Sequence, residues 1–329
     1  MIIKLLVSTS KIAVILFVVI ILLWLILARP SFHTNKTLKK SINEINPDVL
    51  KKHVVMLSEN FSPRSYKHPE NLNKVAGYIA NSFKTSGAKL SEQLFEVYGT
   101  HYRNIIAEYG PESREIIIVG AHYDTNGEQP GADDNASGVA GLLELGQLLA
   151  HKELQSRIVL VAFTLEEPPF FRTDKMGSAF FAKSLSDSNT KVKLMIALEM
   201  IGYFSEDKGS QNYPAPLLRL YYPSTGNFIA VVDQLLSSAA QRIKQSMTQS
   251  IEIPVYSINA PSFIPGVDFS DHMNFWQQGY PAIMVTDTAF YRNDAYHTKE
   301  DTAERLNYEK MVQVIYGVFN YVSQLDSET

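Results

Sequence analysis

The chain has 329 residues, of which 45% are hydrophobic and 19% are charged, and its formal charge at pH 7 is −4. This length suits one large globular domain or two small ones, and nothing in the charge indicates nucleic-acid binding, which requires a basic face. There are no cysteines. Disulfides and zinc–thiolate centres are therefore excluded, and any zinc must be held by His, Asp and Glu side chains.

An unbroken apolar run occupies residues 12–28 and differs from the rest of the chain. As a helix it would be about 25 Å long, slightly short of a ~30 Å hydrocarbon core. A cleaved signal peptide is the alternative, but its apolar core is usually shorter, and Ala28 lacks the small residue two positions earlier that cleavage favours. We therefore predict a retained membrane anchor at residues 1–29, a polar, basic linker at residues 30–45 and one globular domain at residues 46–329.

The charges around the anchor leave its orientation open. Lys4, Lys11 and the amino terminus precede the apolar run, whereas Arg29 and several lysines follow it. The positive-inside rule would place the longer basic side, and the domain after it, in the cytoplasm. This conflicts with the extracytoplasmic domain that we expect for a family-based reason given below.

The globular domain alternates between helical and strand patterns. Asn46 and Pro47 are typical of a helix start, and a second helix is predicted at residues 69–86, closing at Gly87. Short apolar runs predict buried strands, and apolar residues recurring on one face predict helices. The strands are at residues 115–120, 157–164, 193–198, 217–222 and 282–286, and the helices at residues 136–151, 176–185, 228–246 and 303–325. This alternation implies an α/β fold with a largely parallel sheet covered on both faces.

Acidic and histidine side chains stand at the ends of these strands or just before a helix. They are His122 and Asp124, Asp134, Glu166 and Glu167, Glu199, and Tyr296 with His297. In open parallel sheets, ligands bind beyond the carboxyl ends of the strands. We therefore expect these separate segments to bring their side chains to the same rim.

Most of these motifs have a simpler interpretation when taken alone. His122 and Asp124 could lie in a solvated turn, and the glycine-flanked segment at residues 131–138 could supply only a helix cap. Two adjacent glutamates are common on any surface. Glu199 is more informative because it interrupts the apolar segment at residues 194–201, where a glutamate is almost never buried without a partner such as a cation or an arginine.

Taken together, the residues provide the chemistry of a two-metal hydrolase. Asp124 can accept from one ring nitrogen of His122 while the other nitrogen binds metal, and Asp134 can bridge two cations. Of Glu166 and Glu167, one can bind metal while the other acts as a general base. A serine or cysteine nucleophile is poorly supported, because the chain has no G-x-S-x-G segment and no cysteine.

Two further sets of residues each allow two interpretations. Asp271 and His272 could be extra metal ligands or could belong to a pocket wall. Several aromatic residues could line an apolar pocket or pack in the core, namely Phe263, Phe269, Phe275, Trp276 and Phe290.

The ordered segments HYD, GADDNASG, TLEE, LEMIGY and AYHT resemble those of the co-catalytic zinc exopeptidases of the aminopeptidase S and aminopeptidase Y type. The resemblance covers the chain from about residue 46 onward, and several motifs match in order and context. It implies two zinc ions per chain. One would be held by His122, Asp134 and Glu199, and the other by Asp134, Glu167 and His297.

The resemblance also implies the fold and the remaining roles. Asp124 would orient His122, Glu166 would be the general base, and Tyr296 would donate to the oxyanion. The fold would be the zinc-exopeptidase, phosphorylase/hydrolase-like one, with a mixed central sheet of about eight strands. Because members commonly work outside the cytoplasm, we expect a single-pass, membrane-anchored aminopeptidase whose extracytoplasmic catalytic domain acts on peptides with a free amino terminus.

One departure from the family pattern leaves alternatives open. Many members have aspartate where this chain has Glu199, whose longer side chain could alter metal affinity or spacing. The superfamily also contains glutaminyl cyclases, which use one zinc ion, and non-catalytic receptor-like relatives. The receptor alternative requires lost ligands, and none is lost here. The cyclase alternative stays open because its substrate also presents an amino terminus.

Overall fold

The computed structural model describes residues 11, 14–23, 25–26, 42 and 44–328. Residues 14–23 and 25–26 are helical, whereas the rest of the predicted anchor and most of the predicted linker lie outside the described residues. Within the part that is described, no helix has both the length and the apolar character needed to cross a membrane. The anchor and its orientation therefore stay predictions.

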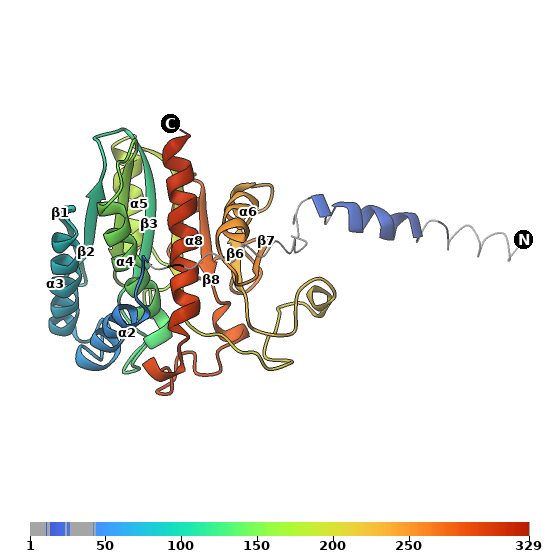
Figure 1. Cartoon of the computed structure of the whole chain (residues 1–329), viewed down its shortest axis with the longest axis horizontal. Helices are drawn as coiled ribbons and strands as arrows, with labels where there is room; N and C mark the ends of the chain where they lie inside the picture. Colours follow the sequence, from blue (N-terminus) through green and yellow to red (C-terminus); the bar gives the residue numbers. More distant parts are fainter. Residues whose placement is uncertain (1–10, 12–13, 24, 27–41, 43, 329) are drawn as a thin grey trace, which may run out of the picture.

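The domain is built on one mixed sheet of eight strands with helices on both faces (Figure 1). The strand order is β1-β2-β4-β3-β5-β8-β6-β7. The strands are β1 (Lys89–Val97), β2 (Thr100–Tyr109), β3 (Glu115–His122), β4 (Arg157–Phe163), β5 (Lys191–Glu199), β6 (Ile229–Asp233), β7 (Val255–Asn259) and β8 (Ala282–Thr286). Central strands β4, β3, β5 and β8 run parallel. Because they run parallel, the carboxyl ends of these four strands share one edge. The β1–β2, β2–β4 and β8–β6 pairs are antiparallel.

Side chains of each central strand alternate between two hydrophobic cores, as the pleat of a strand requires. In β3, Ile117 and Val119 belong to the larger core and Ile116 and Ile118 to the smaller one. The larger core is covered by α2 (Pro47–Val55), α3 (Pro69–Thr85), α4 (Gly138–Ala150), α6 (Ala239–Ser250) and α8 (Tyr308–Ser327). The smaller core is covered by α5 (Gly177–Asp187) and α7 (His272–Gln277). The sheet is therefore shielded on both faces, and its edge is left to carry the site.

Most predicted elements are confirmed, including the start of α2. The Asn46 side chain accepts a hydrogen bond from the Asp48 amide at 2.9 Å, as a helix cap should. The predicted helices that became α3, α4 and α5, and the predicted strands that became β3, β4, β5 and β8, lie within a few residues of their expected bounds. The last helix begins at Tyr308, capped by Asn307, and residues 303–305 form a separate 3-10 turn.

Two predicted elements are wrong. Residues 217–222, predicted as a strand, contain the 3-10 turn η3 (Pro216–Leu220), because Pro216 has no N–H for a strand ladder and is favoured at the start of a helical turn. The helix predicted at residues 228–246 is strand β6 followed by α6. Apolar residues recur in β6, in the connection at Leu235 and Leu236 and in α6, so periodicity alone did not separate the two elements.

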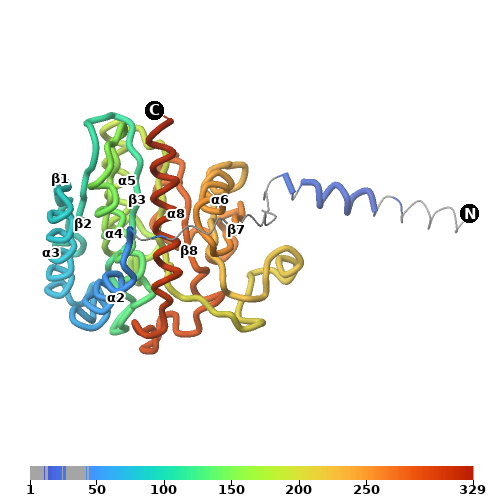
Figure 2. The backbone as a smooth tube through the Cα atoms, viewed as in Figure 1, coloured from blue at the N-terminus to red at the C-terminus, as the bar shows by residue number. Residues whose placement is uncertain are grey.

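Besides β6, three strands were missed. Strand β1 is an edge strand with mostly exposed side chains, so it shows no apolar run, and β2 and β7 are similarly mixed in composition. The expected mostly parallel, mixed sheet of about eight strands is confirmed, and its antiparallel pairs lie outside the four parallel central strands. The backbone trace shows the N-terminal helix projecting from the side of the domain that carries β6 and β7 (Figure 2).

Candidate metal centre

The rim at the carboxyl ends of the central strands brings the five predicted ligands together. His122 is the last residue of β3 and Glu199 the last of β5, while Glu167 follows β4. Asp134 comes from the segment before α4, and His297 from the loop after β8. The side chains form two groups, and the ligand atoms within each group lie within 4.8 Å of one another.

Asp134 is common to both groups and faces a different histidine with each oxygen. Its Oδ1 lies 3.4 Å from His122 Nε2, and its Oδ2 lies 3.1 Å from His297 Nε2. His122 Nε2 is also 3.4 Å from Glu199 Oε2, and His297 Nε2 is 3.2 Å from Glu167 Oε2. Two atoms that each lie about 2.0–2.1 Å from a tetrahedral zinc are about 3.3 Å apart, so these separations suit shared metal ligands.

The hydrogen-bonding state of the ligand atoms tests whether metal fits. The Nε2 atoms of His122 and His297 and the Oε1 atom of Glu167 are buried, and none forms a hydrogen bond of acceptable geometry with the described residues. Buried polar atoms are normally satisfied, so converging unsatisfied atoms require an explanation. Imidazole nitrogens and carboxylate oxygens are the donors that zinc takes in a cysteine-free protein, and this set fits two ions.

The pKa values of the buried carboxylates and of His297 also support metal binding at the rim. Burial raises the pKa of Glu167 to about 8, with Asp134 adding to the shift. Burial alone would lower the pKa of His297, but Asp134 and Glu167 raise it to about 10. Burial likewise raises the pKa of Glu166 well above its usual range. Buried carboxylates so close together repel one another, and dications are the partners that relieve such repulsion.

Glu166 and Tyr296 lie beside the ligand groups without belonging to them. Glu166 is buried, and its Oε2 is 3.9 Å from His122 Nε2. The ring of Tyr296 stacks on His297 with centroids 3.8 Å apart. Burial and the neighbouring carboxylates raise the pKa of Tyr296, so its hydroxyl keeps its proton and can donate.

Asp124 holds more of the rim than predicted. Its two carboxylate oxygens accept the amides of Glu166 and Glu167, each at 3.1 Å. His122 Nδ1 lies 3.2 Å from the Asp124 main-chain carbonyl and 3.6 Å from its carboxylate. The main-chain oxygen is thus the nearer partner of the imidazole, and the Asp124 side chain chiefly fixes the Glu166–Glu167 segment.

Two supports for the ligands were missed in the sequence. The Asn126 side-chain amide lies 2.5 Å from His297 Nδ1. If His297 Nε2 binds metal, its Nδ1 carries the hydrogen and donates it. The Asn126 amide must then accept through its oxygen, and it can, because the oxygen and nitrogen ends of an amide have nearly the same shape. Ser270 donates to Glu199 Oε2 at 2.7 Å, which holds the longer glutamate arm within ligand distance of His122. Single polar residues in loops give no periodic signal that could have identified them.

The backbone around Asp134 is also stabilised by side chains that are far from it in sequence. The Asp301 carboxylate accepts the amides of Asp133 and Asp134 at 3.0 Å, and burial raises the pKa of Asp301 to about 7. Arg64 is fully buried and donates to four main-chain carbonyls, those of Leu57, Tyr123, Pro130 and Gly131. Gly131 has φ +59°, and a Cβ there would lie 2.2 Å from the Asp134 carbonyl. This packing fixes the loop that delivers Asp134.

Asp133 is turned away from the ligand groups. Its oxygens accept from the Gly202 amide at 3.0 Å and from Asn293 Nδ2 at 2.9 Å. Among the described residues, neither ligand group includes Asp271 or His272. His272 Nε2 donates to the Val267 carbonyl at 2.8 Å, which accounts for one of its ring nitrogens.

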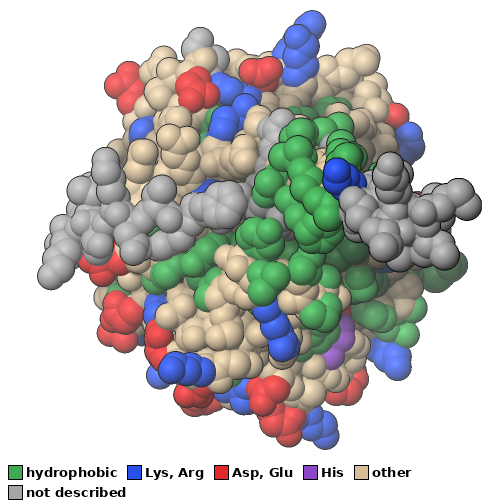
Figure 3. All heavy atoms as spheres, turned by 90° about the vertical axis from the view of Figure 1, so that its right-hand side faces the viewer, with side chains coloured by type: hydrophobic (Ala, Val, Ile, Leu, Met, Phe, Trp, Pro, Cys, Tyr) green, Lys and Arg blue, Asp and Glu red, His purple; other side chains and the backbone are tan. Residues whose placement is uncertain are grey.

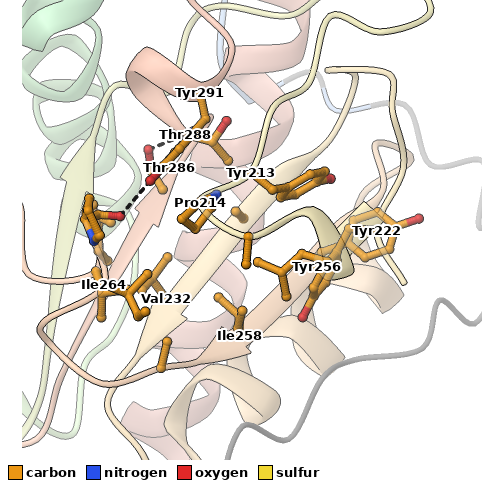
Figure 4. A pocket seen from close by; sticks show the side chains of 18 of the residues that line it. Tyr213, Pro214, Tyr222, Val232, Tyr256, Ile258, Ile264, Thr286, Thr288 and Tyr291 are labelled. Carbon is orange, nitrogen blue, oxygen red and sulfur yellow. Dashed lines mark hydrogen bonds between the residues drawn. The ribbon is translucent and has the colours of Figure 1, made fainter. Parts of the chain in front are cut away.

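An apolar cavity of about 540 Å³ (Figure 4) reaches one of the ligand residues, Glu199. Glu199 and Tyr296 are part of its wall, and so are Phe269 and Phe290. The other aromatic candidates lie elsewhere. Phe275 is fully buried in the smaller core, Trp276 Nε1 donates to the Ala282 carbonyl, and Phe263 is 80% exposed.

Known proteins similar to this chain point to one family. Residues 104–322 match the family described as peptidase family M28. The uncharacterized protein YfbL of Escherichia coli (strain K12) is 51% identical over 282 residues, which cover 83% of this chain and 86% of that protein. Leucine aminopeptidase 1 of Phaeosphaeria nodorum is 26% identical over 305 residues, covering 87% of this chain and 72% of that protein.

Solved structures are similar in fold. A zinc aminopeptidase from Bacillus subtilis superposes with a TM-score of 0.68 at 16% identity, covering 87% of this chain and 96% of that one. Glutaminyl cyclase from Porphyromonas gingivalis superposes with a TM-score of 0.63 at 22% identity, covering 86% of this chain and 99% of that one. Because one architecture serves both proteins, the residues of the rim must decide between their activities.

Proposed function

Because this chain belongs to peptidase family M28 and is a metal-dependent peptidase, we propose that it is a two-zinc aminopeptidase acting on peptides with a free amino terminus. The observation that carries the proposal is the pair of ligand groups sharing Asp134. His122, Asp134 and Glu199 would hold one ion, and Asp134, Glu167 and His297 would hold the other. Ions bound there would supply Lewis acidity and would lower the pKa of a water molecule toward neutrality.

The chain's own residues perform the proton transfers. Glu166 lies beside both ligand groups but belongs to neither, so its carboxylate is free to take a proton from the attacking water and return it to the leaving amine. Tyr296 keeps its proton and donates to the oxygen of the scissile carbonyl, where negative charge develops. Asp124 keeps Glu166 in place through the Glu166 amide.

The cavity supports a preference for apolar N-terminal side chains. Glu199 and Tyr296 lie in its wall together with Phe269 and Phe290, so a residue bound at the metals has apolar surface beside it. Similarity to proteins named leucine aminopeptidase agrees with this preference. Burying an aliphatic side chain contributes roughly 1.5–3 kcal/mol, enough to favour leucine over a charged residue by one or two orders of magnitude.

The expected result is zinc-dependent release of N-terminal residues. Purified full-length protein should hydrolyse leucyl-nitroanilide faster than lysyl- or glutamyl-nitroanilide, lose activity with a chelator and regain it with zinc. Metal analysis should find two zinc ions per chain. An active protein that stays active after verified metal removal would contradict the proposal.

A glutaminyl cyclase is the second candidate because that fold neighbour also handles an amino terminus. The complete second ligand group favours the peptidase. The two activities separate cleanly on a peptide that begins with glutamine. Mass spectrometry would show loss of the whole residue for a peptidase, and loss of ammonia alone for a cyclase.

The N-terminal apolar run supports a further proposal, a single-pass anchor at residues 1–29 with the catalytic domain outside the cytoplasm. The chain's lack of cysteine allows a direct measurement. A Glu153→Cys variant places one thiol at an exposed position of the domain. The protein should stay with membranes after alkaline extraction, and this thiol should react with a membrane-impermeant maleimide in intact cells. Labelling only after lysis would place the domain in the cytoplasm instead.

A further inference from the structure

Exposed apolar side chains of the described domain gather on one side. Leu217 and Leu220 of η3 are 64% and 76% exposed, Leu236 after β6 is 62% exposed, and Phe263 after β7 is 80% exposed. We call these four residues the apolar rim. Leu94 and Tyr98 are also exposed, but they lie at β1, the opposite edge of the sheet. In the space-filling view of the β7 side, hydrophobic side chains of the N-terminal helix lie foremost, with further hydrophobic side chains of the domain around them (Figure 3).

The residues of the apolar rim adjoin the wall of the cavity in sequence. The neighbouring residues Leu218, Leu235 and Ile264 belong to the cavity wall. The same wall includes Ile20 and Leu23 of the N-terminal helix. The apolar rim, the cavity and the N-terminal helix therefore lie on the same side of the domain. The cavity extends from that side to Glu199 and Tyr296 at the metal-ligand edge of the sheet.

The segment around η3 has the composition of a membrane-surface element. Its sequence, Pro-Leu-Leu-Arg-Leu-Tyr at residues 216–221, combines exposed Leu217 and Leu220 with one exposed arginine and one exposed tyrosine, whereas Tyr222 is buried. Arg219 is exposed, and it donates to Asn212 Oδ1 at 3.1 Å. Leucine that enters the acyl boundary, with arginine and tyrosine at headgroup level, is typical of interfacial segments.

Chain length keeps the whole domain near the apolar run. The stretch at residues 30–45 joins the apolar run to α2, and even fully extended it reaches at most about 55 Å. Soluble monomers rarely leave clustered apolar surface beside an apolar cavity without a partner. A bilayer is the partner that the adjoining apolar helix also fits.

We propose that the apolar rim contacts the lipid bilayer beside the N-terminal helix, so that the cavity opens at the membrane surface. The side chains of Leu217, Leu220 and Phe263 enter the boundary between headgroups and acyl chains. A consequence that rests on the proposed function is that peptides whose apolar N-termini adsorb to the membrane are the favoured substrates, since they reach the cavity along the surface.

The cysteine-free chain makes the contact measurable at single positions. Full-length Leu220→Cys and Phe263→Cys variants, each labelled with an environment-sensitive nitrobenzoxadiazole fluorophore, are reconstituted in phosphatidylcholine vesicles with and without doxyl-labelled lipid. Leu94→Cys is the matched control, because Leu94 is a similarly exposed leucine, at 66%, on the opposite edge. We expect the labels at 220 and 263 to shift to shorter wavelength and lose most of their emission to the doxyl lipid, while the label at 94 keeps its emission.

Each other outcome overturns the proposal. Equal quenching of the labels at positions 94, 220 and 263 would show that the apolar rim is not the surface of the domain that selectively contacts lipid. A spectral shift that depends on protein density but not on doxyl lipid would identify a contact between two copies of the chain. A shift that requires an added apolar peptide would identify a peptide groove. Thermal unfolding of each labelled variant shows that it is folded, and no readout depends on peptidase activity, so failure of the proposed function is seen separately.

Discussion

Glu166→Gln should remove peptide hydrolysis while leaving both zinc ions bound. Glutamine has the shape of glutamate but cannot take up a proton from water, so general-base catalysis is lost. The expected fall in turnover is at least the ~10²–10⁴-fold that general acid–base catalysis contributes. Metal content should be unchanged, because Glu166 belongs to neither ligand group and the Glu166 amide still donates to Asp124. Steady-state kinetics with leucyl-nitroanilide and metal analysis of the same preparation measure both quantities.

The neighbouring glutamate provides the matched control. Glu167→Gln changes the same chemical group one residue away, but Glu167 Oε2 lies 3.2 Å from His297 Nε2 within a ligand group. This variant should lose activity together with metal. A Glu166→Gln enzyme that keeps a tenth of wild-type turnover, or one that loses zinc as Glu167→Gln does, would show that the base has been misassigned.

How much of the fold the sequence predicts depends on how each strand is buried. Strands β3, β4, β5 and β8 are buried on both faces, so they appear as continuous apolar runs whose ends are visible. Strand β1 has few buried side chains and gives no such signal. Strand β6 is fully buried but leads toward α6, and the combined segment matched a helix.

The candidate site divides in the same way. His122 and Glu199 were predictable because each ends a buried strand, where a polar side chain after apolar residues is conspicuous. Arg64 and Asp301 were not, although they hold the loop of Asp134. Both act on main-chain groups far away in sequence, as in the contact of Asp301 with the Asp134 amide at 3.0 Å. Contacts of this kind depend on the tertiary fold and leave no local pattern.

Asp134→Ala should disturb both metal sites at once. Asp134 presents Oδ1 toward His122 and Oδ2 toward His297, so its loss removes one ligand from each group. With two dications bound as proposed, it would also remove negative charge that relieves their repulsion, which is strong in a buried site. Glu199→Ala and Glu167→Ala each remove a ligand from a single group, so they should weaken mainly one site. Native mass spectrometry should find fewer than one zinc per chain for Asp134→Ala and about one for each of the others.

The adjacent aspartate tests whether the bridging residue has been assigned correctly. Asp133 accepts from the Gly202 amide and from Asn293, so Asp133→Asn should lower the thermal unfolding temperature more than the zinc content. Asparagine keeps one oxygen acceptor and the side-chain volume, which limits the structural damage. If Asp134→Ala still carries two zinc ions while Asp133→Asn loses them, the bridge is Asp133. The contrast is informative because both carboxylates are buried and adjacent in sequence, and only the direction in which each side chain points separates a metal ligand from a structural support.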